Sequence, residues 1–136
     1  MNPLKLILTI KIIFTAIFWA LPLLFFPKHA ARLLGIPVPM PILFAHLLGA
    51  AFVALLAGYI FGLVELNHGK DVSNTVWVGI VSNGLAFLIL VTFAGQWTTW
   101  GTRAEIYMWG STTMTLLITL GLILFGVVHN QSIQTE

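Results

Sequence analysis

Four long apolar runs, separated by short polar segments, account for most of this 136-residue chain. They cover about residues 4–26, 42–64, 75–95 and 104–128. A helix of about 20 apolar residues crosses the roughly 30 Å hydrocarbon layer of a membrane, and each run is long enough to do so. The pattern predicts an all-α fold, an integral membrane four-helix bundle that forms a single domain over residues 1–136.

The second run carries a row of small residues. Ala50, Ala54, Gly58 and Gly62 recur at every fourth position, which places them on one face of a helix. Inside a bilayer such small side chains let two backbones come close enough for dispersion contacts. We therefore expect this row to be a helix-packing face, with His46 one step back along it.

The first run is interrupted only by Lys11 and Pro22. Pro22 has no amide hydrogen to donate to the carbonyl of Phe18, so the pattern predicts a kink in the last turns of this helix. The ammonium of Lys11, about two turns into the run, either reaches the membrane surface along its apolar stem or pairs with an acid. Reaching the surface is the favoured interpretation.

An amide lies near the middle of the third run, at Asn83. An amide at that depth normally faces another helix and forms a hydrogen bond there. We expect Asn83 to serve as a structural clamp between helices.

The segment between the first two runs has the features of a short amphipathic helix. Pro27 is suited to begin a helix and Gly35 to end one in a left-handed conformation. Lys28 and Arg32 alternate there with alanines and leucines. We expect an interfacial helix whose cations contact lipid phosphates, and a ligand-binding rim is the alternative.

Four spans place both termini and the polar segment 65–74 on one side of the membrane, with the connectors 27–41 and 96–103 on the other. Lysines and arginines number three on each side, so the positive-inside rule does not choose an orientation. We expect aromatic residues around the second connector to mark the membrane surface, namely Trp97, Trp100, Tyr107 and Trp109.

Composition supports a membrane protein and excludes several functions. Hydrophobic residues make up 59% of the chain and charged residues 7%, against about a quarter charged in soluble proteins. No cysteine is present, so thiol chemistry is excluded, and a net charge of +2 without a basic run argues against a nucleic-acid partner. The four histidines lie in different segments, so no metal site, haem or other cofactor is predicted. We find no activated nucleophile or phosphate-binding loop, so an enzyme is the less favoured interpretation.

One group of polar residues falls at a common predicted depth. His46 begins the second span, Gln96 ends the third, and Arg103 and Glu105 begin the fourth. Polar groups at one depth on neighbouring helices converge on a ligand or partner site, or only on one another. The second alternative, in which Arg103 pairs with Glu105 and His46 bonds a backbone carbonyl, is the favoured one.

The first half of the chain also carries Phe-Phe-Pro, Leu-Leu-Gly-Ile-Pro and Leu-Phe-Ala-His-Leu-Leu-Gly-Ala-Ala, in that order. This layout resembles the small bacterial four-helix membrane proteins grouped around DoxX and its uncharacterised relatives. The resemblance implies a four-helix membrane bundle, sometimes linked with redox or respiratory partners, and no settled reaction. Those proteins often carry an arginine at the position that resembles His46, and this chain departs from the pattern there.

Two classes of function fit these features. The favoured one is a non-catalytic accessory, assembly or oligomerising subunit, which packs against copies of itself or within a larger membrane complex. The alternative is a small transporter, or a lipid-binding or quinone-binding protein, whose site is the face of His46, Arg103 and Glu105. The chain lacks a deeply placed acid or a broken span, which favours the first class. Either would be a multi-pass protein in contact with the lipid bilayer, and we expect it in a bacterial inner membrane.

Overall fold

The computed structural model describes residues 2–128, and over that range the chain forms helices and connecting segments without strands. Four helical segments are long and apolar enough to cross a membrane, namely Pro3–Phe25, Leu43–Asn67, Ser73–Thr92 and Thr102–Val128. The predicted all-α class and the multi-pass membrane character are confirmed to that extent. The second segment extends to Asn67 and the third begins at Ser73, because the intervening polar turn is shorter than predicted. The third segment ends at Thr92, three residues before the predicted bound.

The elements follow one another in the order α1 (Pro3–Thr15), η1 (Ala16–Ala20), α2 (Leu21–Phe25), α3 (Pro27–Leu34), α4 (Leu43–Asn67), α5 (Ser73–Thr92), α6 (Ala94–Trp97), α7 (Thr102–Leu122) and η2 (Ile123–Val128). The two η segments are π-helical continuations of α1 and α7. The first and last spans are therefore each composed of more than one helical segment.

The irregularity predicted near Pro22 takes the form of the π-helical segment η1, directly before α2. Because Pro22 cannot donate a hydrogen bond, the carbonyl of Phe18 needs another donor. The hydroxyl of Tyr107 on α7 donates to it over 2.6 Å. The sequence feature that disturbs the first span thus also creates a contact between the first and last spans.

The connector after the first span contains the predicted short helix. α3 begins with Pro27 and ends at Gly35, whose φ of 72° is the left-handed conformation that favours glycine. Lys28 and Arg32 are both exposed on it. The chain then passes through a cis peptide between Met40 and Pro41 before α4 begins.

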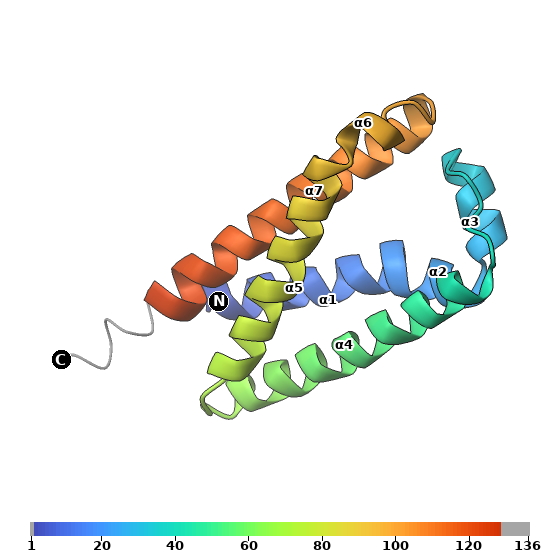
Figure 1. The fold of residues 1–136 in the computed structure, drawn as a ribbon. Coiled ribbons are helices and arrows are strands. Elements are labelled where there is room, and N and C mark those ends of the chain that lie inside the picture. Colours follow the sequence, from blue (N-terminus) through green and yellow to red (C-terminus); the bar gives the residue numbers. More distant parts are fainter. Residues whose placement is uncertain (1, 129–136) are drawn as a thin grey trace.

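The helices form two groups that separate with distance from the turn between α4 and α5 (Figure 1). α5 packs along α7, whereas α4 packs against α1, η1 and α2. α4 and α5 are joined by the short turn that follows Asn67 and diverge from it (Figure 1). η2 contacts α1 and α5, and α3 contacts α7 toward the opposite end.

A buried apolar cluster lies where α1 and α5 begin and α7 ends. We call it the hairpin-end core, and its members are Leu4, Leu8, Val72, Val76, Ile118 and Leu122. Gly79 allows a close approach beside this cluster, because a Cβ atom there would stand 2.6 Å from Cδ1 of Leu122. The buried apolar cluster is therefore at this end of the helices.

Candidate functional site

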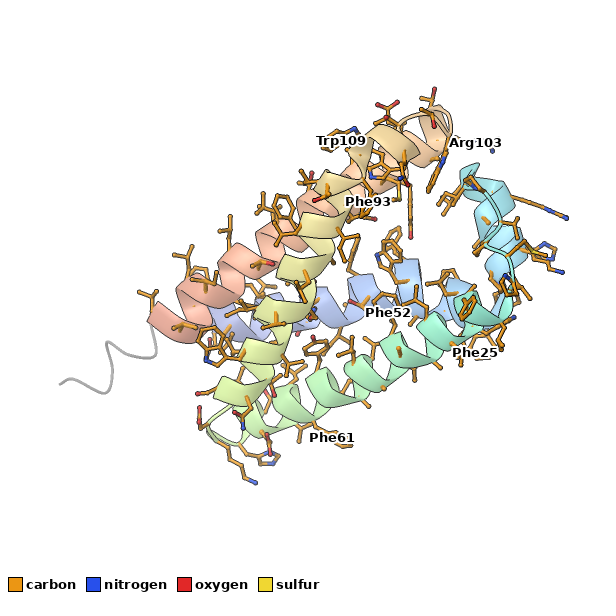
Figure 2. The ribbon with its side chains drawn as sticks, in the orientation of Figure 1. Phe25, Phe52, Phe61, Phe93, Arg103 and Trp109 are labelled. Atoms are coloured by element: carbon orange, nitrogen blue, oxygen red, sulfur yellow. The ribbon has the colours of Figure 1, made fainter. Side chains whose placement is uncertain are left out.

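A cavity of about 390 Å³ lies between the first, second, third and fourth spans, within the size range of small-molecule sites. We call it the Lys11 cavity. Its apolar walls are Phe14, Trp19, Leu48, Phe52, Leu55, Ala86, Ile89, Leu90 and Met108. Its polar lining residues are Lys11, Thr15, Tyr59, Ser82, Asn83 and Thr115. Figure 2 shows Phe52 on the side of α4 that faces η1, where its ring lies 5.9 Å from that of Trp19.

Lys11 is the charged group of this cavity, and it does not reach the membrane surface as we expected. Its side chain is only 3% exposed. The ammonium lies 4.3 Å from the centre of the Tyr59 ring, a cation–π contact. Among residues 2–128 no carboxylate forms an ion pair with it. Both interpretations made from the sequence are therefore wrong, because α4 packs against α1 and side chains of α4, α5 and α7 surround the cavity that Lys11 lines.

Tyr59 connects Lys11 to the third span. Its hydroxyl lies 2.8 Å from the hydroxyl of Ser82, which itself donates to the carbonyl of Gly79 over 3.2 Å. A serine hydroxyl has one proton, so Tyr59 is the donor in the Tyr59 to Ser82 bond. This bond joins α4 to α5 at the wall of the cavity and holds the Tyr59 ring beneath the ammonium.

Asn83 does not form the clamp between helices that the sequence suggested. Its side-chain amide donates to the carbonyl of Gly79, four residues earlier in the same helix, over 2.7 Å. The residue is 7% exposed, and its side chain lines the cavity. The expected contact across helices is absent from the described hydrogen bonds because this bond stays within α5.

Three of the four first-span residues that line the cavity form one row. Lys11, Thr15 and Trp19 are spaced four residues apart and all line it. The same face of α1 is apolar nearer the N-terminus, where Leu4 and Leu8 belong to the hairpin-end core. No described hydrogen bond involves the Thr15 hydroxyl, so this row brings an ammonium and a hydroxyl to the cavity together.

The polar face predicted from His46, Gln96, Arg103 and Glu105 is not joined within the described chain by any hydrogen bond or ion pair between two of its members. Gln96 is exposed on α6, and Glu105 is half-buried in the first turn of α7. The rim pair between Arg103 and Glu105 is not formed. A role of these residues in binding a ligand or partner stays a prediction.

His46 and Arg103 instead satisfy carbonyl groups at helix ends. Nδ1 of His46 lies 2.7 Å from the carbonyl oxygen of Leu24, and Nη1 of Arg103 donates to that of Leu33 over 3.1 Å. The last carbonyls of a helix have no partner within it, and side-chain donors commonly supply one. In Figure 2, Arg103 lies at the start of α7 next to α3. The hydrogen bond between His46 and a backbone carbonyl, which the favoured alternative predicted from the sequence, is therefore present.

Trp97 also serves a helix end, and its position at the membrane surface stays a prediction. It is 2% exposed, and its indole N–H donates to the carbonyl of Leu90 over 2.9 Å. Its ring packs edge to face on Trp109, with centroids 5.0 Å apart. α6 folds this tryptophan back against the ends of α5 and α7, which the hydropathy of the connector did not indicate.

The small-residue row on α4 lies mostly on the outside of the chain. Ala50, Ala54 and Gly58 are exposed, whereas Gly62 packs against Thr75. The close approach to the first span is made by Gly49 instead, where a Cβ atom would stand 2.5 Å from the backbone nitrogen of Leu24. Packing of the outer row against another molecule stays a prediction.

Trp19 and Met108 also line a second, largely apolar cavity of about 280 Å³ beneath α3. The two cavities are therefore neighbours, separated by side chains of η1 and α7. Trp19 belongs to the π-helical segment η1. The irregular part of the first span therefore lies between the two cavities.

No family model, curated protein or solved structure matches this chain. Within the described residues, no three histidine, aspartate or glutamate side chains lie close enough together to hold a metal ion. The chemistry available is therefore that of the Lys11 cavity itself, which offers one ammonium, hydroxyl groups and an amide inside apolar walls. The sequence contained one signal of it, a lysine within an apolar run followed at spacing four by a threonine and a tryptophan.

Proposed function

We propose that this protein binds a lipid, a quinone or a similar amphipathic small molecule in the Lys11 cavity. The observation that carries the proposal is a lysine side chain, 3% exposed, that lines a largely apolar cavity between membrane-spanning helices. Ionisable groups inside a membrane are costly and most often mark a path or site for a ligand. A packing role alone would be served better by an apolar side chain at this position.

The proposal includes the setting of the site. The four spans form a bundle in a bacterial inner membrane, as in the DoxX-like proteins that the sequence resembles. α3 lies in the interface, where Lys28 and Arg32 reach lipid phosphates. Leu48 on α4 and Ile89 on α5 both line the cavity and are exposed. A lipid-soluble molecule therefore enters sideways, between the two helices that diverge in Figure 1.

The test is to fill the cavity without changing its polar groups. Ala86→Phe adds a phenyl ring at the cavity wall, and Leu85→Phe adds a similar ring at a neighbouring position that is 55% exposed. Each variant is purified in a mild detergent, and bound small molecules are identified by native mass spectrometry. We expect the wild type and Leu85→Phe to retain the same molecule and Ala86→Phe to lose it. Equal retention by all three proteins would contradict the proposal.

A second candidate function, that of a non-catalytic accessory or oligomerising subunit, is supported by the outward row of Ala50, Ala54 and Gly58. Small residues on an exposed helix face allow a second membrane helix to approach closely. The chain has no cysteine, so single cysteines are suitable probes. Ala54→Cys should form disulfide-linked dimers in membranes, and Val81→Cys, exposed on α5, should not. Equal cross-linking at both positions would remove the support for this function.

A further inference from the structure

The charge of Lys11 has no counter-charge in the described chain. Glu65 and Asp71 are exposed at or next to the turn between α4 and α5, and Glu105 lies in the first turn of α7. None of the three lines the cavity. The remaining acid of the chain, Glu136, lies outside the described residues. The cation–π contact with Tyr59 is thus the one described interaction of the ammonium with a partner that carries negative charge density.

A buried cation without an anion is expensive in a low-dielectric environment, and a ring face offsets only part of that cost. A negatively charged group in the cavity would offset more, because it forms both an ion pair and a charge-assisted hydrogen bond. Thr15 is one helical turn from Lys11, lines the same cavity, and has a hydroxyl that donates to no described acceptor. An oxyanion beside Lys11 would therefore find two donors from one face of the first span.

We infer that the ligand of the Lys11 cavity is a monoanionic amphiphile, with a carboxylate or equivalent oxyanion paired to Lys11 and an apolar body against the aromatic walls. The inference rests on the proposed function and names the ligand class of the same site. A single cation matches a single negative charge. Phe14, Trp19 and Phe52 supply an apolar surface in the same cavity, which the exposed Leu48 also lines. The ligand reaches the site from the membrane.

The experiment compares two probes of the same length and shape that differ in charge, decanoic acid and decanamide. The full-length protein is placed in phosphatidylcholine nanodiscs at neutral pH. Binding is followed by NMR of probes isotopically labelled at the carbonyl carbon, which reports the environment of the head group directly. Empty nanodiscs measure partition into lipid alone.

Lys11→Met removes the cation and keeps most of the length of the side chain, and Lys11→Arg keeps the charge. Lys5→Met is the matched control, because Lys5 is on the same helix but does not line the cavity. We expect decanoate to bind the wild type, Lys11→Arg and Lys5→Met. Binding to Lys11→Met should be about tenfold weaker or more, the effect of losing a hydrogen bond to a charged group. Decanamide should bind weakly, with no dependence on Lys11.

The outcomes separate the inference from the proposed function. If both probes bind equally well, and Ala86→Phe weakens both, the cavity is a binding site but Lys11 does not select an anion, so the inference fails alone. If neither probe gives a bound signal beyond that of empty nanodiscs, the inference and the proposed function both fail. Thermal unfolding of Lys11→Met in the same nanodiscs checks that lost binding does not reflect lost folding.

Discussion

The hairpin-end core and the Lys11 cavity are built largely by the same helices, but their composition differs sharply. At the core, α1 contributes Leu4 and Leu8, and the six members of the cluster are all apolar. Three residues further along the same face, α1 contributes Lys11, and the space around it is not filled by side chains. The comparison indicates that the apolar cluster and the polar lining of the cavity are separated along the helix axis, so substitutions in the two regions should affect different properties.

The largest effect on stability should come from the core. Leu122→Ala removes a side chain that is 0% exposed and leaves a void among Leu8, Val76 and their neighbours. Such truncations cost about 2–5 kcal/mol in soluble proteins, and we expect about 2 kcal/mol here because the unfolded helices remain in lipid. Leu120→Ala, at a position 46% exposed on the same helix, should change the free energy of unfolding by less than about 0.5 kcal/mol. Titration with a denaturing detergent measures both, and similar losses would mean that the core is not where stability resides.

The next effect tests the contact that supports the cavity from the α4 side. In Gly49→Ala the new methyl group would stand 2.5 Å and 2.8 Å from backbone atoms of Leu24 and Leu23, which cannot move as a side chain can. We expect a loss of about 1.5 kcal/mol, within the usual range of about 1–3 kcal/mol for overpacking. Gly58→Ala is the control, since nothing lies within 4 Å of its added methyl group. Gly58→Ala should leave the free energy of unfolding unchanged or raise it slightly. A larger loss from Gly58→Ala than from Gly49→Ala would show that the row of Ala50, Ala54 and Gly58 makes the close helix contact.

A smaller effect concerns the π-helical segment between the two cavities. Tyr107→Phe leaves the Phe18 carbonyl without its donor, and we expect a loss of about 1 kcal/mol. Pro22→Ala supplies a backbone N–H that can bond the same carbonyl. In the double variant the effect of Tyr107→Phe should therefore shrink. A double-mutant cycle in which Tyr107→Phe has equal effects with Pro22 and with Ala at this position would contradict the prediction. It would show that the bond from Tyr107 to the Phe18 carbonyl does not depend on the missing N–H of Pro22.

Within the cavity, removing the charge should hardly affect the fold. Lys11→Met abolishes a cation–π contact but also the cost of a buried cation, and these terms oppose each other. We expect the free energy of unfolding to stay within about 1 kcal/mol of the wild-type value. A small increase is the expected direction, because the variant no longer buries a cation. A loss of unfolding free energy as large as that of Leu122→Ala would show that Lys11 is a packing residue. The two regions would then not differ in their role.

The smallest effect is at the turn that joins α4 to α5, outside both regions. Hydrogen bonds from the Ser73 side chain and then its backbone N–H hold the pKa of the Asp71 carboxyl below its usual value. A lowered pKa in the folded state contributes stability that is present above the unfolded value of about 3.9 and is lost as the pH falls through the folded value. Unfolding followed against pH should show this acid dependence in the wild type, and Asp71→Asn should lack it. Identical pH profiles would contradict the prediction.

Local features of the sequence were sufficient for much of the fold. The four spans follow from the length of apolar runs, which depends on no other part of the chain. Pro27 and Gly35 mark the bounds of α3, because one has no amide hydrogen and the other tolerates a positive φ. Pro22 correctly indicated an irregular first span, although Tyr107, the partner of the Phe18 carbonyl, is 89 residues after Phe18 and could not be inferred.

The candidate site was decided by tertiary structure alone. In a soluble helix, polar residues identify the outer face, but α4 is apolar around its whole circumference, so its sequence does not state which face is inside. Lipid and protein interior are similarly apolar, and the rotation of such a helix is set by close packing against its neighbours. That packing turned Gly49 inward and Ala50 outward, and it placed Tyr59 over Lys11. The sequence determined that Lys11 would lie in a run long and apolar enough to cross a membrane, and only the packing of α4 and α7 against α1 determined that it would line a cavity.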